Sequence, residues 1–140
     1  MRWVLDTDVV VAALRSPKGA SAALLKQIDQ GLVTLLLSIP LALEYEAICH
    51  LAEHRLASGL SQQEVEVFLS TLIGFAEPVD IYFLWRPQLR DPGDEMVLET
   101  AVNGQADSIV SFNRRDFGLA PKSFGIEVLL PREALMRTRQ

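Results

Sequence analysis

Residues 2 to 11 read RWVLDTDVVV and predict a short buried strand that ends at two carboxylates, Asp6 and Asp8. Residues 3–5 are apolar throughout, as is typical of a strand covered on both faces. Residues 9–14, VVVAAL, then favour a helix. This change from strand to helix indicates the first unit of a parallel sheet, with charged side chains at the carboxyl end of its strand.

The rest of the chain repeats the alternation of short apolar runs with segments of helical periodicity. Ser61 and Glu64 predict a capping box at the start of one helix, and Pro40 and Gly59 bound another. Further strands are expected at 33–38, 107–112 and 125–130, a strand or an extended crossing at 79–85, helices at 20–31, 40–59, 61–76, 96–105 and 131–139, a loop at 88–95 and a turn at 113–118. This order predicts an α/β protein with a three-layer, doubly wound (Rossmann-like) α/β/α fold and a central parallel sheet.

The length and charge of the chain limit the number of domains and the kinds of ligand that it can bind. A chain of 140 residues, 49% hydrophobic, can build one domain with a real core (residues 1–140) and is too short for two. The net charge of -5 disfavours non-specific binding to duplex nucleic acid. Residues 1–85 hold 5 Lys and Arg against 10 Asp and Glu, whereas residues 86–140 hold 8 of each. An anionic ligand is therefore expected to meet the C-terminal half, through Arg86, Arg90, Arg114 or Arg115.

The cysteine content and the apolar runs bear on location. The single cysteine, Cys49, cannot form an internal disulfide, which favours a reducing compartment. The first apolar run is interrupted at once by carboxylates, and the longest later run is too short for a bilayer and contains Pro40. We expect a soluble, cytoplasmic protein that does not enter a membrane.

Carboxylates from several segments are predicted to meet at one edge of the sheet. In parallel sheets, ligands bind beyond the carboxyl ends of the strands. Like charges gathered there repel one another unless cations neutralise them, and hard divalent ions such as Mg²⁺ or Mn²⁺ prefer oxygen ligands. The residues that this rule brings together are Asp6, Asp8, Glu44, Asp94 and Asp116.

Four of these carboxylates also have a structural explanation. Asp8 is a candidate N-cap for the helix at 9–14, and Asp94 for the helix at 96–105. Glu44 fits a solvent-facing helix position, and Asp116 fits a turn. Asp6 is harder to explain in this way, because it ends an apolar strand. The joint placement of all five, rather than any single one, favours a metal site.

Four blocks of sequence resemble the PIN domain family, and within it the small toxin components of toxin–antitoxin systems. They are VLDTDVVVAAL, LALEYEAI, RDPGDEMVLETAVNGQADSIVSFNRRDF and GIEVLLPREAL, and they cover nearly the whole chain in order. The third is the most specific, because it joins an acidic helix start, an alanine-glycine helix end and a strand-turn aspartate.

The resemblance implies a metal-dependent ribonuclease in which Asp6, Glu44 and Asp94 match three acidic metal-binding positions. Two residues depart from the family pattern. Asp8 stands where Asn or Ser is usual, and Asn113 stands where many members have Asp. Asn113 offers a neutral carbonyl oxygen as a weaker ligand, and Asp116 is expected to supply the missing charge.

The implied reaction is hydrolysis of an RNA phosphodiester by a metal-activated water. Thr7, Ser111 or Asn113 would orient the scissile phosphate. Arg114 and Arg115 would contact RNA phosphates near the cleft. The resemblance further implies products with a 3′-hydroxyl and a 5′-phosphate, a homodimer, and an antitoxin partner that occupies the cleft.

Two other functions fit parts of the pattern. VLDTDVV also fits the first motif of haloacid-dehalogenase-like phosphatases, which would need a lysine near the phosphate, and Lys122 is the lysine that follows Lys26. Alternatively, the weaker ligand at Asn113 fits a catalytically weakened scaffold that only binds a partner. Release of phosphate from a monoester would favour the first, and lack of stabilisation by Mn²⁺ the second.

Overall fold

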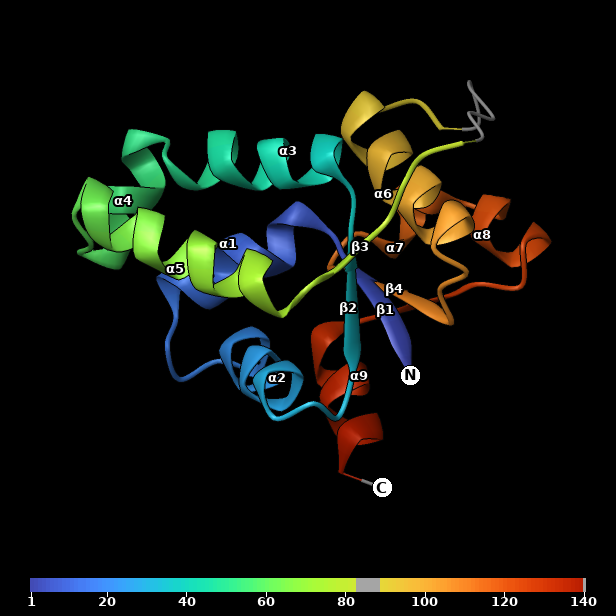
Figure 1. Cartoon of the computed structure of the whole chain (residues 1–140), viewed down its shortest axis with the longest axis horizontal. Coiled ribbons are helices and arrows are strands. Elements are labelled where there is room, and N and C mark those ends of the chain that lie inside the picture. The colour runs from blue at the N-terminus through green and yellow to red at the C-terminus, as the bar shows by residue number, and fades with distance from the viewer. Residues whose placement is uncertain (83–88, 140) are drawn as a thin grey trace.

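A wholly parallel sheet forms the centre of the computed structural model, which describes residues 1–82 and 89–139 (Figure 1). Within these residues its strands are β1 (Arg2–Leu5), β2 (Thr34–Leu37), β3 (Glu77–Pro78), β4 (Ser108–Val110) and β5 (Glu127–Leu129). Their spatial order is β3-β2-β1-β4-β5. β1 is thus the central strand, and the predicted parallel sheet is confirmed.

The register of β1 places the first aspartate just beyond the sheet. Trp3 pairs with Leu35 of β2 and with Ser108 of β4. The Asp6 amide donates a hydrogen bond of 2.9 Å to the carbonyl oxygen of Val110, at the end of β4. Residues that follow β1 and β4 therefore meet at the same edge.

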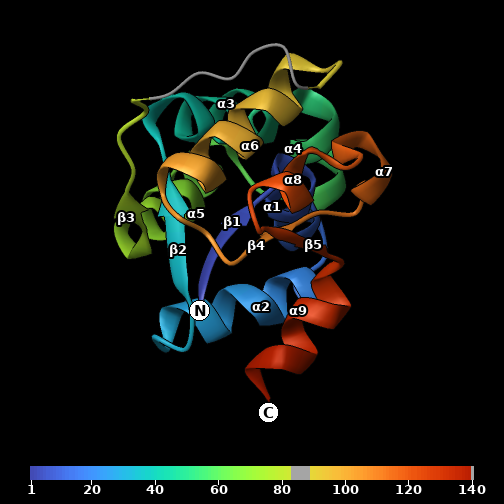
Figure 2. The same cartoon turned by 90° about the vertical axis from the view of Figure 1, so that its right-hand side faces the viewer.

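Helices lie on both sides of the sheet, so the predicted three-layer α/β/α fold is confirmed. Figure 1 shows α2 and α5 to the left of the strands and α6, α7 and α8 to the right, and Figure 2 shows the same arrangement after a quarter turn. α6 packs against β1, β2 and β4, and α2 packs against α9. The helices are α1 (Thr7–Arg15), α2 (Ala20–Asp29), α3 (Ile39–Cys49), α4 (Ala52–Ser58), α5 (Gln62–Phe75), α6 (Pro92–Asn103), α7 (Arg114–Phe117), α8 (Ala120–Ser123) and α9 (Pro131–Thr138).

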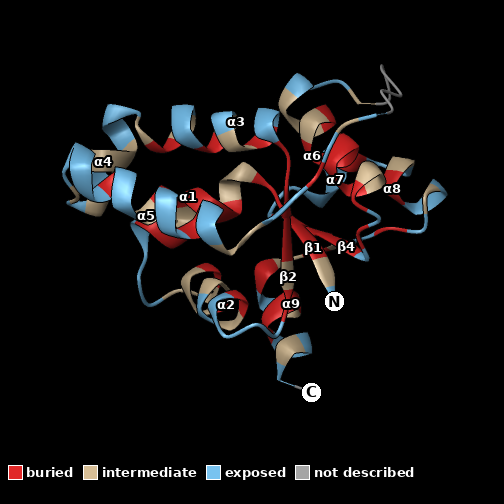
Figure 3. Cartoon of the chain, viewed as in Figure 1, coloured by how far each residue is buried: buried red, intermediate tan, exposed pale blue. Residues whose placement is uncertain are grey.

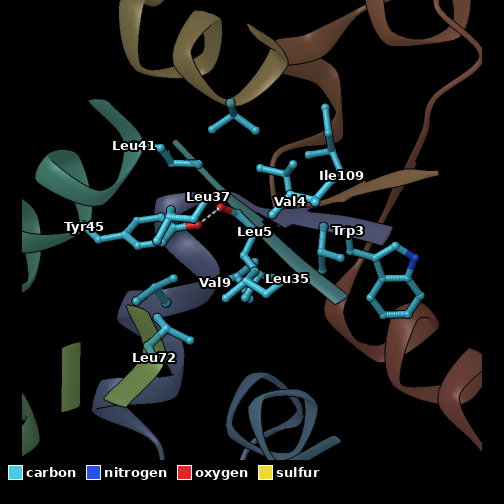
Figure 4. Packing of buried hydrophobic residues seen from close by; sticks show 14 of the residues in the cluster. Trp3, Val4, Leu5, Val9, Leu35, Leu37, Leu41, Tyr45, Leu72 and Ile109 are labelled. Carbon is cyan, nitrogen blue, oxygen red and sulfur yellow. Dashed lines mark hydrogen bonds between the residues drawn. The ribbon is translucent and has the colours of Figure 1, made fainter. Parts of the chain in front are cut away.

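The core lies along the strands and the helix faces turned toward them (Figure 3). Trp3, Leu5 and Leu35 are buried in one continuous apolar cluster. Figure 4 shows Tyr45 of α3 reaching into this cluster, where its hydroxyl donates a hydrogen bond to the carbonyl oxygen of Leu5. α3 is thereby tied to the end of the central strand. No helix in the described part of the chain is both long enough and apolar enough to span a membrane.

The structure confirms the capping box and corrects the long helix predicted at 40–59. Ser61 and Glu64 exchange side-chain and backbone hydrogen bonds at the start of α5. The predicted long helix is two helices, because Leu51 adopts an extended backbone conformation (φ -60°, ψ 139°) between α3 and α4. This break lets α4 turn and pack against α1. Tertiary packing here overrides the helix propensity of the segment.

Three further boundaries differ from the sequence predictions. β3 is two residues long and precedes the predicted segment 79–85, although the Val79 amide still donates a hydrogen bond of 2.9 Å to the carbonyl oxygen of Leu37. Residues 83–85 lie outside the described part of the chain. The predicted loop at 88–95 ends at Pro92, where α6 begins, since Asp91 caps that helix. The predicted turn at 113–118 contains the short helix α7, and the short helix α8 was not predicted.

Candidate functional site

Asp6 ends the central strand and is held by two hydrogen bonds. Its Oδ1 accepts from the Thr7 amide at 2.8 Å, which makes Asp6 the N-cap of α1. Its Oδ2 accepts from the Ser111 hydroxyl at 2.6 Å. Burial raises the pKa of Asp6, the negative charges of Asp116 and Asp91 raise it further, and the two hydrogen bonds oppose these effects. The hydrogen bonds thus fix the orientation of the carboxylate, while the charges that act on its pKa are negative.

Asp8 lies in the first turn of α1 and faces the segment after β4. Its Oδ2 accepts from the Phe112 amide at 3.1 Å and from the Asn113 side-chain amide at 2.9 Å. Its Oδ1 is buried and has no hydrogen-bond partner. Burial, followed by the charge of Asp6, raises the pKa of Asp8 to about 7. The alternative that Asp8 caps α1 is wrong, because Asp6 does so.

Asp94 enters the site from the first turn of α6. Burial raises its pKa to about 6, with contributions from the charges of Asp6, Asp91 and Asp116. The alternative that Asp94 caps this helix is wrong: Asp91 is the N-cap and accepts from the Gly93 amide at 2.7 Å. With the cap supplied elsewhere, the structural role that remains for Asp94 is the favourable position of its charge in the first turn of α6.

Glu44 of α3 approaches the start of α6. A Cβ atom added to Gly93 would lie 3.9 Å from Glu44 Oε1 and 3.0 Å from Asp91 Oδ1, so the glycine leaves room for both carboxylates. Two buried hydrogen bonds set the position of α3: the Tyr45 bond to β1, and the 2.7 Å bond between the hydroxyls of Ser38 and Thr100. Glu44 is therefore carried on a helix that is anchored to both β1 and α6.

A pocket of about 480 Å³ opens beside these carboxylates, between the start of α6 and the α7–α8 segment. Asp94 and Asp116 both line it, together with Asp91, which the sequence analysis missed. The Asp-Pro-Gly order at 91–93, typical of a helix N-terminus, was the available signal for Asp91. The other lining residues are Leu89, Arg90, Arg115, Phe117, Gly118, Leu119 and Ala120.

The structure places several predicted phosphate contacts differently. Ser111 is fully buried beneath Asp6, so it positions that carboxylate rather than facing a phosphate. Arg114 is not among the residues that line the pocket, and it donates to Glu133 at 3.1 Å. The side-chain amide of Asn113 faces Asp8, and Thr7 is half-buried. Arg86 lies outside the described residues.

The donor set fits a hard divalent ion. Asp6, Asp8 and Asp94 all have raised pKa values, and a cation would relieve their repulsion and satisfy the unpartnered Oδ1 of Asp8. The carboxylates are not tightly bunched. Among the described residues, the one group of three possible ligands whose atoms all lie within 4.8 Å is elsewhere, at Glu46, His50 and Glu66. Mg²⁺ suits the wider spacing, because it keeps several water ligands and uses one or two carboxylates.

The family model described as PIN domain matches residues 2–115, which is most of the chain. The chain belongs to the PIN domain family. The match spans the strand end at Asp6, the helix that carries Glu44 and the start of α6, and it ends one residue before Asp116. No curated protein and no solved structure matches the chain. PIN domains are typically metal-dependent nucleases, so family membership supports a hydrolase of this general kind.

Proposed function

We propose that this PIN domain is a cytoplasmic, Mg²⁺- or Mn²⁺-dependent endoribonuclease, the toxin of a toxin–antitoxin pair. The observation that carries the proposal is the pocket lined by Asp91, Asp94 and Asp116, with Asp6 near enough for its charge to raise the pKa of Asp94, in a chain of this family. Burial raises the pKa values of Asp6, Asp8 and Asp94, and the charges of neighbouring aspartates raise them further. Such an arrangement costs stability unless a cation binds, so a structural role alone does not explain it.

In this proposal, different residues bind the ion and accept the proton during hydrolysis. Asp6, Asp8 and Asp94 would hold the ion, with Ser111 keeping Asp6 in orientation. When bound, a divalent ion lowers the pKa of water and neutralises charge on the phosphate. Glu44 accepts the proton that the attacking water loses. The new bond forms between the water oxygen and phosphorus and the bond to O3′ breaks, which leaves a 5′-phosphate and a 3′-hydroxyl.

The exposed apolar side chains of α3 and α4 support a protein partner. Ile39 and Leu43 on α3 are 76% and 59% exposed, and Leu56 on α4 is 83% exposed. Ile39 and Leu43 are four residues apart and so lie on one face of α3, and exposed apolar side chains that lie together mark contact surfaces. We propose that the protein forms a homodimer and binds an antitoxin that covers the pocket.

The phosphatase alternative has less support from the structure. Lys122, the lysine that such a phosphatase would need near the phosphate, lies on α8 and lines a separate hollow with Arg114 and Glu127. The acidic pocket is lined by arginines instead.

The test is cleavage of single-stranded and hairpin RNAs by purified protein, with Mn²⁺ or with EDTA. We expect Mn²⁺-dependent cutting, reduced by about 100-fold or more in Asp6→Asn and Asp94→Asn. Asp29→Asn, at an exposed position on α2, controls for the loss of one charge.

Thermal unfolding with Mn²⁺ provides a second measurement that does not depend on activity. Wild-type protein should gain stability from the ion, and both site variants should gain less. Stabilisation without any cleavage would indicate a scaffold, and release of phosphate from a monoester with RNA left intact would indicate a phosphatase.

A further inference from the structure

Two arginines line the acidic pocket, and neither forms a hydrogen bond or ion pair with any residue in the described part of the chain. They are Arg90, just before α6, and Arg115, on α7. Other arginines near the surface are committed to glutamates: Arg114 to Glu133 at 3.1 Å, and Arg137 to Glu127 at 2.8 Å. Arginine readily pairs with carboxylates, so two unpaired guanidinium groups beside several aspartates call for an explanation.

Arg90 and Arg115 line the same pocket as Asp91, Asp94 and Asp116, yet no ion pair joins them to these carboxylates within the described residues. The two guanidinium groups are therefore left available for an anion from outside the protein.

The backbone that carries each arginine is anchored. The Leu89 amide donates a hydrogen bond of 2.6 Å to Oε1 of Glu95, a buried residue of α6, which fixes the residue next to Arg90. Two residues beyond Arg115, Phe117 is fully buried under α7. The two side chains thus begin from anchored backbone in two separate segments that line the pocket, one just before α6 and the other in α7.

The pocket also offers apolar surface beside the arginines. Leu119 lines the pocket and is 82% exposed, and Leu89 also lines it. Apolar side chains contact the faces of unstacked bases, whereas the bases of a duplex are stacked and paired. The net charge of -5 also gives duplex little general attraction to this protein.

We propose that Arg90 and Arg115 bind the phosphates that flank the scissile bond of single-stranded RNA, with Leu119 against an unpaired base. This inference rests on the proposed function, because it assigns the substrate-binding residues of the same pocket. Arg90 thereby becomes a binding residue, and Arg114 is excluded from the site.

Binding of a short fluorescent single-stranded RNA, measured by anisotropy in EDTA so that hydrolysis is suppressed, tests the assignment. We expect Arg90→Ala and Arg115→Ala each to weaken binding about tenfold. Each should also reduce the slope of log affinity against log salt by about 0.7. Arg114→Ala is the matched control, with the same charge change on the same short helix, and should change affinity by less than about twofold. Leu119→Ser should weaken binding of the single strand, and a duplex of the same sequence should bind more weakly to wild type.

Cleavage rates with Mn²⁺ separate this inference from the proposed function. We expect the two arginine variants to raise KM while kcat changes little, because these side chains lie beside the reacting phosphate rather than on it. Equal effects of Arg114→Ala and Arg115→Ala, no RNA binding by wild type, or equal affinity for duplex would overturn the inference. Arginine-dependent binding without Mn²⁺-dependent cleavage would overturn the proposed function and the link to a scissile bond, and would support only the assignment of Arg90 and Arg115 to binding of RNA phosphates.

Discussion

Replacing Asp8 with asparagine should stabilise the metal-free protein at neutral and alkaline pH. In the folded protein, burial and the charge of Asp6 raise the pKa of Asp8 from 3.8 to about 7. A carboxyl group whose pKa is raised on folding binds its proton more tightly in the native state. Wild-type stability should therefore fall as the pH rises from about 4 to about 7, and Asp8→Asn removes this loss.

The size of the effect follows from the shift in pKa. A change of about three pKa units corresponds to a ceiling of about 4 kcal/mol. Asp8 is only half-buried, so solvent screening reduces the expected gain to about 1–3 kcal/mol at about pH 8. The substitution also alters the bonds from Phe112 and Asn113. That second cost, about 1 kcal/mol, is independent of pH.

Urea unfolding in EDTA at about pH 4 and about pH 8 measures both contributions. The difference in free energy of unfolding between variant and wild type should be about 1–3 kcal/mol more favourable to the variant at the higher pH. Comparing the two pH values cancels the cost of the altered hydrogen bonds. Asp29→Asn should show no such change with pH. If Asp8→Asn shifts the free energy of unfolding by the same amount at both pH values, then folding does not raise the pKa of Asp8 and the reasoning is wrong.

Three further substitutions test the parts of the fold that hold the site in place. Tyr45→Phe removes the buried hydrogen bond to Leu5 and should cost about 1–3 kcal/mol in urea unfolding; no loss would mean that this bond does not anchor α3. Gly118→Ala places a side chain at φ +52° in the pocket wall and should cost about 1–2 kcal/mol, seen as a lower Tm; an unchanged Tm would show that the turn relaxes freely. Ser61→Ala removes the capping box of α5 and should cost about 0.5–2 kcal/mol without altering RNA cleavage, so loss of cleavage would contradict the separation of this helix from the site.

The sequence alone determined the sheet and its charged edge. Apolar strands separated by helices leave few arrangements other than a parallel sheet covered on both faces, because each strand must bury both of its faces. The carboxyl ends of such strands meet at one edge, and this rule was sufficient to select Asp6 and Asp94 for that edge. Capping chemistry is equally local, which is why Ser61 and Glu64 could be paired from their spacing.

Only the tertiary structure decided which aspartate does which task. Asp6 and Asp91 cap helices as well as lying at the site, whereas Asp8 and Asp94 cap no helix. All four have the same chemistry, so their roles depend on neighbours distant in sequence. The roles of the arginines also depend on the tertiary structure. Arg114 and Arg115 are adjacent in the chain, but Arg114 pairs with Glu133, whereas Arg115 lines the pocket. The sequence gives the chemical group at each position. The burial of that group and its charged or hydrogen-bonding partners depend on segments that come together only when the chain folds.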